Sequence, residues 1–424
     1  MPPTTEAPAE TARRFRGLAR LRRPSWGGVI GATLAVACGL GLLLFKFGLG
    51  LVHLSYDLPF AVRPGVQPRE AVMVYLDDDS HKELGQPYNA PWDRALHAQL
   101  LERLTAEHAR AVVFDIVFTG PGPTPEADEQ LARAIKANGK VVLAADLVTT
   151  GYGREGAGMR TLVPPYELFS EAAAGLGTAE MNPDDDLFIR QHLMPVRDDL
   201  LPGMSWATAK VVGATVTTEA ESQSQERWMN YYGPPTTIPN VSFYRVVRTD
   251  LGDAIPAGFF SNKVVFVGAR LITKFGGERK DEYPTPHSRW ASSNPFMPGA
   301  EIQATQFLNL TRGDWLRRLP QGIEVGSLTI LGLIFGFTLA RLRAWMATGL
   351  ALGFALITCV LSYLLFSHAL LWIPWLLVLV QIFVALTWSV VFNSIQLYVQ
   401  NKLYEASLAL YLSPKLVKKF SNNK

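Results

Sequence analysis

Five polar residues follow or end short apolar runs in the middle of the sequence: Asp77, Asp79, Asp115, Asp146 and Arg270. Carboxylate oxygens are the ligands that hard cations prefer, so this set predicts a pocket for a cation or a small ligand. The alternative is that each acid ends a strand and caps the helix that follows it. Capping is favoured for any single residue, and it is favoured less strongly for the set as a cluster.

The sequence carries no motif that predicts a catalytic residue or a metal centre. It lacks a metal-spaced set of cysteines and histidines, a G-x-S-x-G turn, a Walker loop and an H-E-x-x-H helix. The histidines of this region are scattered without ligand spacing: His81, His97, His108, His192 and His287. We therefore expect no catalytic residues, no metal site and no cofactor in this chain.

The five polar residues need a scaffold that brings the ends of several strands together. Buried strands are predicted at 72–76, 111–117, 141–145 and 263–267, and helices after Trp92, at 126–137 and at 299–309. Strands that alternate with helices indicate an α/β domain with a mostly parallel sheet flanked by helices. Ligands of such sheets lie beyond the carboxyl ends of the strands. Residues 150–260 are rich in Pro, Gly and Ser, and we assign no elements to them.

Long apolar runs on both sides of this domain indicate a membrane protein in contact with lipid. Charged residues make up 18% of the 424 residues, against about a quarter in soluble proteins. The net charge of +3 and the lack of a basic stripe exclude a nucleic-acid partner. Four segments can cross lipid as helices: 26–52, 323–340, 344–366 and 369–392. The first is longer than a signal-peptide core and lacks a clear cleavage site, so we expect an uncleaved anchor.

Basic residues beside these helices predict the orientation of the chain. Arginines crowd residues 13–23, Arg341 and Arg343 lie between two predicted helices, and lysines follow the last helix. The positive-inside rule places all three groups in the cytoplasm, although Arg317 and Arg318 oppose it. We therefore expect cytoplasmic segments at 1–25 and 393–424, and an extracytoplasmic domain at 53–322. The protein would be a multi-pass protein of the inner (plasma) membrane.

Small residues recur at every fourth position of the first predicted membrane helix: Gly27, Gly31, Ala35 and Gly39. Such a ridge lets two helix backbones approach closely in lipid, so these residues are candidates for helix packing. The alternative is the general abundance of glycine in membrane helices. Cys38 and Cys359 both lie in apolar runs, so the outer domain uses no disulfide.

Several segments of the outer domain resemble the CHASE sensory domain of the second type. They are VMVYLDDD (72–79), WDR (92–94), FDIVF (114–118), DDDLFIR (184–190), NYYGPPTTIPNVSFY (230–244), KVVFVGAR (263–270), YPTPHSRW (283–290) and MPGAEIQATQFLN (297–309). The resemblance implies an extracytoplasmic sensor, preceded by one membrane helix and followed by three, with a cytoplasmic effector. Two departures put any transferred ligand role in doubt: Leu187 and Phe188 stand where a glycine is usual, and Gln303 stands where a histidine is expected.

The last residues resemble the segment before the catalytic domain of class III adenylate cyclases, on the motif YLSPKLVKKF (411–420). Before it, apolar residues recur with near-heptad spacing: Ile395, Val399, Leu403, Ala406 and Leu410. This spacing favours a parallel two-stranded coil and hence a homodimer, and an amphipathic helix on the membrane is the alternative. The 32 residues from Asn393 onward are too few for a catalytic domain. Such a domain, absent from this chain, would use Mg²⁺ or Mn²⁺ with ATP.

Three functional hypotheses follow from these patterns. The leading one is the sensing and signal-transducing module of an adenylate cyclase-like receptor, which forms a homodimer and responds to an unidentified extracytoplasmic ligand. The alternative is a membrane-anchored periplasmic enzyme that uses a metal ion at the acidic strand ends. A transporter is disfavoured because the membrane helices lack paired ionisable residues.

Overall fold

The computed structural model of this protein describes residues 25–88, 90–150, 159–193, 201–250, 255–271, 281–290 and 296–411. The chain divides into two compact units. The first unit comprises the chain up to Tyr56 and from Leu319 onward, and the second comprises Asp57–Arg318. The arginines at 13–23 and most of the motif 411–420 lie outside the described residues.

The second unit is built on a seven-stranded sheet in the order β4-β3-β2-β7-β1-β6, with β5 also paired to β3. Only the β3–β4 pair is antiparallel, and the other pairs described are parallel. The strands are β1 Ala71–Asp77, β2 Ala111–Phe114, β3 Val141–Thr150, β4 Met159–Val163, β5 Gly175–Thr178, β6 Asn240–Ser242 and β7 Val264–Arg270. The mostly parallel α/β sheet predicted from the sequence is therefore present.

Helices cover both faces of this sheet, as the near-continuous apolar strands require. They are α4 Asp78–Glu83, α5 Arg94–Ala106, α6 Pro125–Asn138, α7 Glu167–Ser170, α8 Met204–Val211, α9 Phe243–Val247 and α10 Gly299–Arg312. Short 3₁₀ turns and strands complete the unit: η2 Thr215–Thr217, η3 Ala220–Ser224, η4 Pro286–Arg289, β8 Glu282–Pro284, β9 Phe296–Pro298 and β10 Arg317–Arg318. Alternation along the strands divides the core into two layers.

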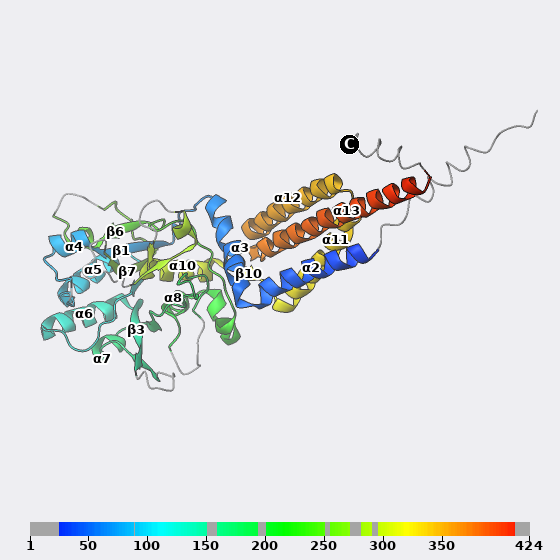
Figure 1. Ribbon diagram of the computed structural model, residues 1–424. Coiled ribbons are helices and arrows are strands. Elements are labelled where there is room, and N and C mark those ends of the chain that lie inside the picture. Colours follow the sequence, from blue (N-terminus) through cyan, green and yellow to red (C-terminus); the bar gives the residue numbers. More distant parts are fainter. Residues whose placement is uncertain are drawn as a thin grey trace, which may run out of the picture. The chain divides into compact units, whose positions relative to one another are not determined.

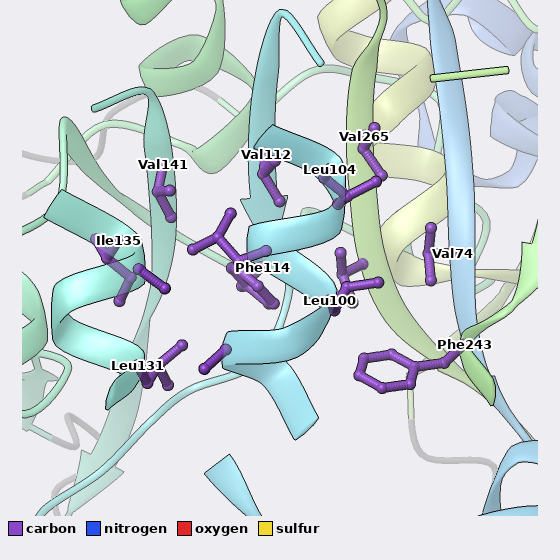
Figure 2. Packing of buried hydrophobic residues seen from close by; sticks show 14 of the residues in the cluster. Val74, Leu100, Leu104, Val112, Phe114, Leu131, Ile135, Val141, Phe243 and Val265 are labelled. Carbon is purple, nitrogen blue, oxygen red and sulfur yellow. The ribbon is translucent and has the colours of Figure 1, made fainter. Parts of the chain in front are cut away.

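One layer contains Val74 and Phe114 of the sheet together with Leu100 of α5 and Leu131 of α6, all of them buried. Figure 2 shows these side chains interleaved between the two helices and the strands. The opposite layer contains Met73 and Tyr75 and packs against α8 and α10. Burial of this apolar surface is the main stabilising contribution, at roughly 25 cal/mol per Å² removed from water.

Three predicted strands of this unit end three to five residues away from the expected position. The strand expected to run to residue 117 ends at Phe114, and β7 extends to Arg270 rather than ending at residue 267. Strand β3 extends to Thr150 rather than ending at residue 145, so Asp146 lies within the strand. The unassigned region 150–260 holds β4, β5, β6, α8 and α9. These elements are short, and their formation depends on pairing and packing partners that are distant in sequence.

Among its described residues, the first unit contains four helices that are long and apolar enough to cross a membrane (Figure 1). Their bounds in the structure are α2 Ser25–Leu44, α11 Gln321–Ala340, α12 Ala344–His368 and α13 Trp375–Tyr411, and β11 is Leu371–Trp372. The segment predicted as one helix at 26–52 is divided: a 3₁₀ turn η1 (Lys46–Gly48) separates α2 from α3 (Leu49–Val62). The last membrane helix is predicted to end at residue 392, but in the structure α13 continues without a break to Tyr411.

Small residues and buried polar groups lie where α2, α11 and α13 pack together. A Cβ atom at Gly336 of α11 would overlap the backbone of Ala32, so the two backbones are in direct contact. The Gln381 amide, fully buried in α13, donates to the carbonyl oxygens of Ala35 (3.2 Å) and Leu328 (2.9 Å). Close approach and interhelical hydrogen bonds hold helices together where lipid offers no hydrophobic drive.

The four small residues singled out on α2 all lie against other parts of the same chain. Gly27 faces Phe392, Gly31 faces Trp388 and Gly336, and Gly39 faces Gln381. The Ala35 side chain is fully buried. The ridge is therefore occupied by α11 and α13 of its own chain.

Candidate functional site

The carboxyl ends of β1, β2 and β7 bring three of the predicted residues to one edge of the sheet. Asp77 pairs in register with Arg270 across β1 and β7. Asp115 directly follows Phe114, which pairs with Val267 of β7. Because these strands are adjacent and parallel, their ends meet at the edge where ligands of α/β sheets bind.

The Asp77 carboxylate is already occupied as a helix cap. Its Oδ1 accepts hydrogen bonds from the backbone N–H (2.9 Å) and the hydroxyl (2.6 Å) of Ser80, at the start of α4. Its Oδ2 accepts from the Ser242 hydroxyl at 2.5 Å, which ties β1 to β6. This arrangement matches the capping alternative rather than a ligand role.

The remaining predicted acids do not assemble with Asp77. Asp79 is exposed on α4, and Asp146 is exposed on β3 with its Oδ1 accepting the N–H of Leu147 (2.8 Å). Within the described ranges, no three of Asp77, Asp79, Asp115 and Asp146 bring their carboxylate oxygens within metal-binding distance of one another. The geometry therefore gives no support to the metal-dependent enzyme that the sequence left open.

Asp115 is paired electrostatically with Asp281, a residue that the sequence did not single out. Burial, and then the nearby Asp281 carboxylate, raise the pKa of Asp115 well above its ordinary value. Burial, and then the charge of Glu282, raise the pKa of Asp281 to about 6. Space for these groups comes from two glycines, because a side chain at Gly268 would meet Ala300 and one at Gly299 would meet the Asp281 carboxylate.

Arg270, the fifth predicted residue, lies with its guanidinium 5.4 Å from the centre of the Tyr75 ring. The Tyr75 hydroxyl donates to Oε2 of Glu301 (3.0 Å), and the N–H of Thr236 donates to the same oxygen (2.9 Å). Burial is the main cause that raises the pKa of both Tyr75 and Glu301. Glu301 thus joins the start of α10 to β1, which is a structural role.

A second polar cluster centres on Arg190, whose side chain is 0% exposed. Its guanidinium makes a bidentate pair with Asp57 (2.9 Å to each oxygen) and donates to Asp184 (2.7 Å) and Asp186 (2.8 Å). Arg289 also binds Asp57, at 2.9 Å. We refer to Asp57, Asp184, Asp186, Arg190 and Arg289 as the Arg190 cluster.

The electrostatics of the Arg190 cluster are those of a tightly compensated buried group. Burial alone would lower the pKa of Arg190, but the hydrogen bonds that it donates to Asp57 and Asp186 and the Asp57 charge raise this pKa above its ordinary value. The ring of Phe188 lies 4.6 Å from the guanidinium carbons of both Arg190 and Arg289. Paired charges and the aromatic contact together offset the cost of desolvation.

Asp57 is the part of this cluster that sequence reasoning missed. It lies in α3, the helix in which the chain passes from the first unit to the second. The available signal was an isolated acid in an apolar helix, which needs a cationic partner. The segment 184–190, which contains three acids and an arginine, contributed to the sequence interpretation only as part of the family resemblance.

Comparison with known families identifies the fold on which these clusters lie. A family model described as the CHASE2 domain matches residues 32–339. This chain belongs to the CHASE2 domain family. No curated protein and no solved structure gives a match to it.

The CHASE2 match covers the whole second unit and extends into α2 at one end and α11 at the other. The family therefore includes membrane-spanning candidates together with the α/β domain. CHASE2 domains are sensor domains, so the module belongs to a sensory class. The Arg190 cluster and the Asp115–Asp281 pair are polar centres of this CHASE2 domain.

Proposed function

We propose that this CHASE2 protein is the sensing and signal-transducing module of a membrane receptor whose output is an adenylate cyclase. In this proposal the α/β domain lies outside the inner membrane, both termini lie in the cytoplasm, and a ligand outside changes the activity of a catalytic domain that follows α13. The family membership supports the sensory part of the proposal, and the short motif at 411–420 supports the cyclase part.

The observation that carries the proposal is the attachment of α3 to the sensor domain through Asp57. The carboxylate is fully buried and is held by Arg190 and Arg289, which come from distant parts of the α/β domain. A ligand that shifts the 184–190 segment would break or rebuild these bonds and so displace α3. Coupling of this kind requires only that the ligand favours one of two arrangements.

The output end of the proposal is α13, which continues past the apolar span as one helix to Tyr411. On this extension Ile395, Val399 and Leu403 are 49%, 48% and 65% exposed in the isolated chain. Their near-heptad spacing fits a parallel coiled coil with a second copy of the chain. A dimer would bring two catalytic domains together.

The coupling is tested by fusing a class III adenylate cyclase catalytic domain after Lys424 and measuring cyclic AMP formation in membranes. We expect Arg190→Gln to change the output several-fold, while Arg103→Gln on the surface of α5 leaves it unchanged. Equal output from the parent, the Arg190 variant and a chain without residues 57–318 would reject the sensory role.

The dimer is tested separately by cysteine crosslinking in a Cys38→Ala, Cys359→Ala background. We expect Val399→Cys to form a disulfide-linked dimer in membranes and Asn401→Cys, on the opposite side of the helix, to form none. Crosslinking that is equal at both positions would contradict the coiled coil. Orientation is tested with reporter enzymes fused at residue 424 and within 57–318, which should report opposite compartments.

A further inference from the structure

Arg227 is a buried arginine without an acidic partner among the residues that the structure describes. Its side chain is 2% exposed. The guanidinium donates to the Ser222 hydroxyl (2.7 Å) and the Gln225 carbonyl (3.1 Å), with a longer contact to Oε1 of Gln225 (3.5 Å). Its Nε atom has no acceptor in the described part of the chain. No described carboxylate lies within ion-pair distance of it either.

The other buried arginines of the same domain show what is missing. Arg94 pairs with Asp128 at 2.5 Å, and Arg190 pairs with three carboxylates. Burial lowers the pKa of Arg227, and no neighbouring charge offsets that shift. A guanidinium stays protonated at neutral pH, so its charge here is balanced only by neutral acceptors and ring faces.

Two tryptophans lie against the Arg227 guanidinium. Its central carbon is 4.8 Å from the centre of the Trp315 ring and 5.4 Å from that of Trp206. Both indoles are only partly buried. The rings contribute cation–π attraction and shield the charge from water, but they supply no negative charge.

Further buried donors without acceptors come from α10. The N–H of Ser205 donates to Oε1 of Gln303 (3.3 Å), which fixes that amide with its NH₂ group directed away from Ser205. The Ser205 hydroxyl donates to Oε1 of Gln306 (3.0 Å). Both Nε2 atoms are buried and have no acceptor among the described residues. A buried donor that makes no hydrogen bond is destabilising, so two such donors together indicate a missing acceptor.

Helix α8 contacts both the two glutamines and Arg227. Ser205, which holds both amides, and Trp206, which contacts the guanidinium, are consecutive residues of α8. On the other side, the backbone N–H of His192 donates to the Arg227 carbonyl (2.9 Å), and the His192 ring bonds Asn309, one turn beyond Gln306 on α10. Burial, with the Arg227 charge adding to it, lowers the pKa of His192 to about 3, so this ring is neutral.

We propose that Arg227, Gln303 and Gln306 form a binding site for a small oxyanion, either a carboxylate or a tetrahedral oxyanion such as sulfate or phosphate. A planar guanidinium edge and amide NH₂ groups are the donors that such oxygens prefer. The partly buried indoles give the site an edge toward solvent. That this anion is the stimulus rests on the proposed sensory function. The existence of the binding site is argued from the buried donors alone.

The test is a titration of the full chain in lipid nanodiscs with acetate, sulfate and phosphate separately, at constant ionic strength balanced with chloride. Tryptophan fluorescence and calorimetry report binding. We expect saturable binding of at least one probe, and its identity distinguishes a carboxylate from a tetrahedral anion. Arg227→Gln should weaken that binding at least tenfold, and Arg103→Gln should leave it unchanged.

A second variant covers the case in which Arg227→Gln does not fold. Gln306→Glu keeps the size of the side chain but places a carboxylate beside the donors, so it should abolish anion binding and raise the melting temperature. No saturable binding of any probe, or binding that both variants leave intact, would overturn the proposal. Binding that leaves cyclic AMP output of the cyclase fusion unchanged keeps the site and rejects its role as the stimulus.

Discussion

The two units of this CHASE2 protein place apolar residues in opposite ways. In the α/β unit, Leu100 and Phe114 are fully buried, and exposed positions are mostly polar. In the membrane unit, Leu356 and Phe383 are about two-thirds exposed, whereas Gln381 and Ser389 are fully buried. Water makes burial of apolar surface favourable, but lipid does not distinguish a leucine at the surface from one inside.

Burial of a leucine or phenylalanine side chain therefore stabilises the α/β unit, whereas it is almost neutral for the stability of the membrane unit. The α/β unit depends on side-chain volume, and its buried charges must be compensated locally. The membrane unit depends on close backbone approach, for which glycine is needed at a few positions. Four predictions test this contrast, in decreasing order of expected effect.

The largest effect is expected in the Arg190 cluster of the α/β unit. Arg190→Met leaves Asp57 and its neighbours buried without their main cation, which should cost about 3–5 kcal/mol of stability. Thermal unfolding of the full chain in nanodiscs measures the loss. The control, Arg103→Met, breaks a partly exposed pair with Glu107 and should cost less than about 1 kcal/mol. Equal losses would show that the cluster is not tightly coupled.

Leucine truncation compares the two units directly. Leu100→Ala removes a side chain that is wholly enclosed in the α/β core and should cost about 2–5 kcal/mol. Leu356→Ala removes a side chain on α12 that is 66% exposed and should change stability by about 0.5 kcal/mol or less. Chemical denaturation followed by circular dichroism measures both. A loss at Leu356 as large as that at Leu100 would mean that this face of α12 packs against protein.

Glycine substitution tests the membrane unit in the same way. Gly336→Ala puts a methyl group into the backbone of Ala32, so α2 and α11 must separate, at a cost of about 1–3 kcal/mol. Gly353→Ala on α12 meets no atom within 4 Å and should be neutral or slightly stabilising. Melting temperatures of the two variants in the same detergent measure the difference in stability. A neutral Gly336→Ala would contradict direct contact of the backbones.

The smallest effect concerns the pH dependence of the Asp115–Asp281 pair. The folded-state pKa of Asp281, about 6, lies above its unfolded value, so the folded state binds the extra proton between about pH 4 and 6. The stability contributed by this proton is present at pH 4 and is lost as the pH rises through 6. Asp281→Asn should therefore match the parent in stability near pH 4 and be the more stable protein at pH 7.5, with the difference growing as the pH rises through 6.

The Asp281→Asn variant is expected to fold, because asparagine tolerates the positive φ of 61° at this position. Melting temperatures of both proteins across pH 4–8 give the difference curve. A constant offset over this range would show that the carboxyl does not change its protonation on unfolding. The buried histidines have lowered pKa values and act with the opposite sign, but they cancel in the difference.

Helices and strands that have a clear local sequence pattern could be predicted without the structure. Apolar runs predicted four helices that could span a membrane, and the strands β1, β2, β3 and β7 with the helices after them, since burial on both faces leaves a continuous apolar signature. The sequence also indicated that Asp77 ends its strand. Period and composition are properties of one segment and need no partner.

Which polar groups lie in contact depends on the tertiary fold and could not be predicted from local sequence patterns. Asp57 binds Arg190 across 133 residues of sequence, and Asp281 lies beside Asp115 because β2 and the start of α10 converge at one edge of the sheet. Arg227 is unusual only because no described acid lies beside it, which no sequence pattern reports. A buried charge is stabilised by its neighbours in space, and those neighbours are set by the fold as a whole.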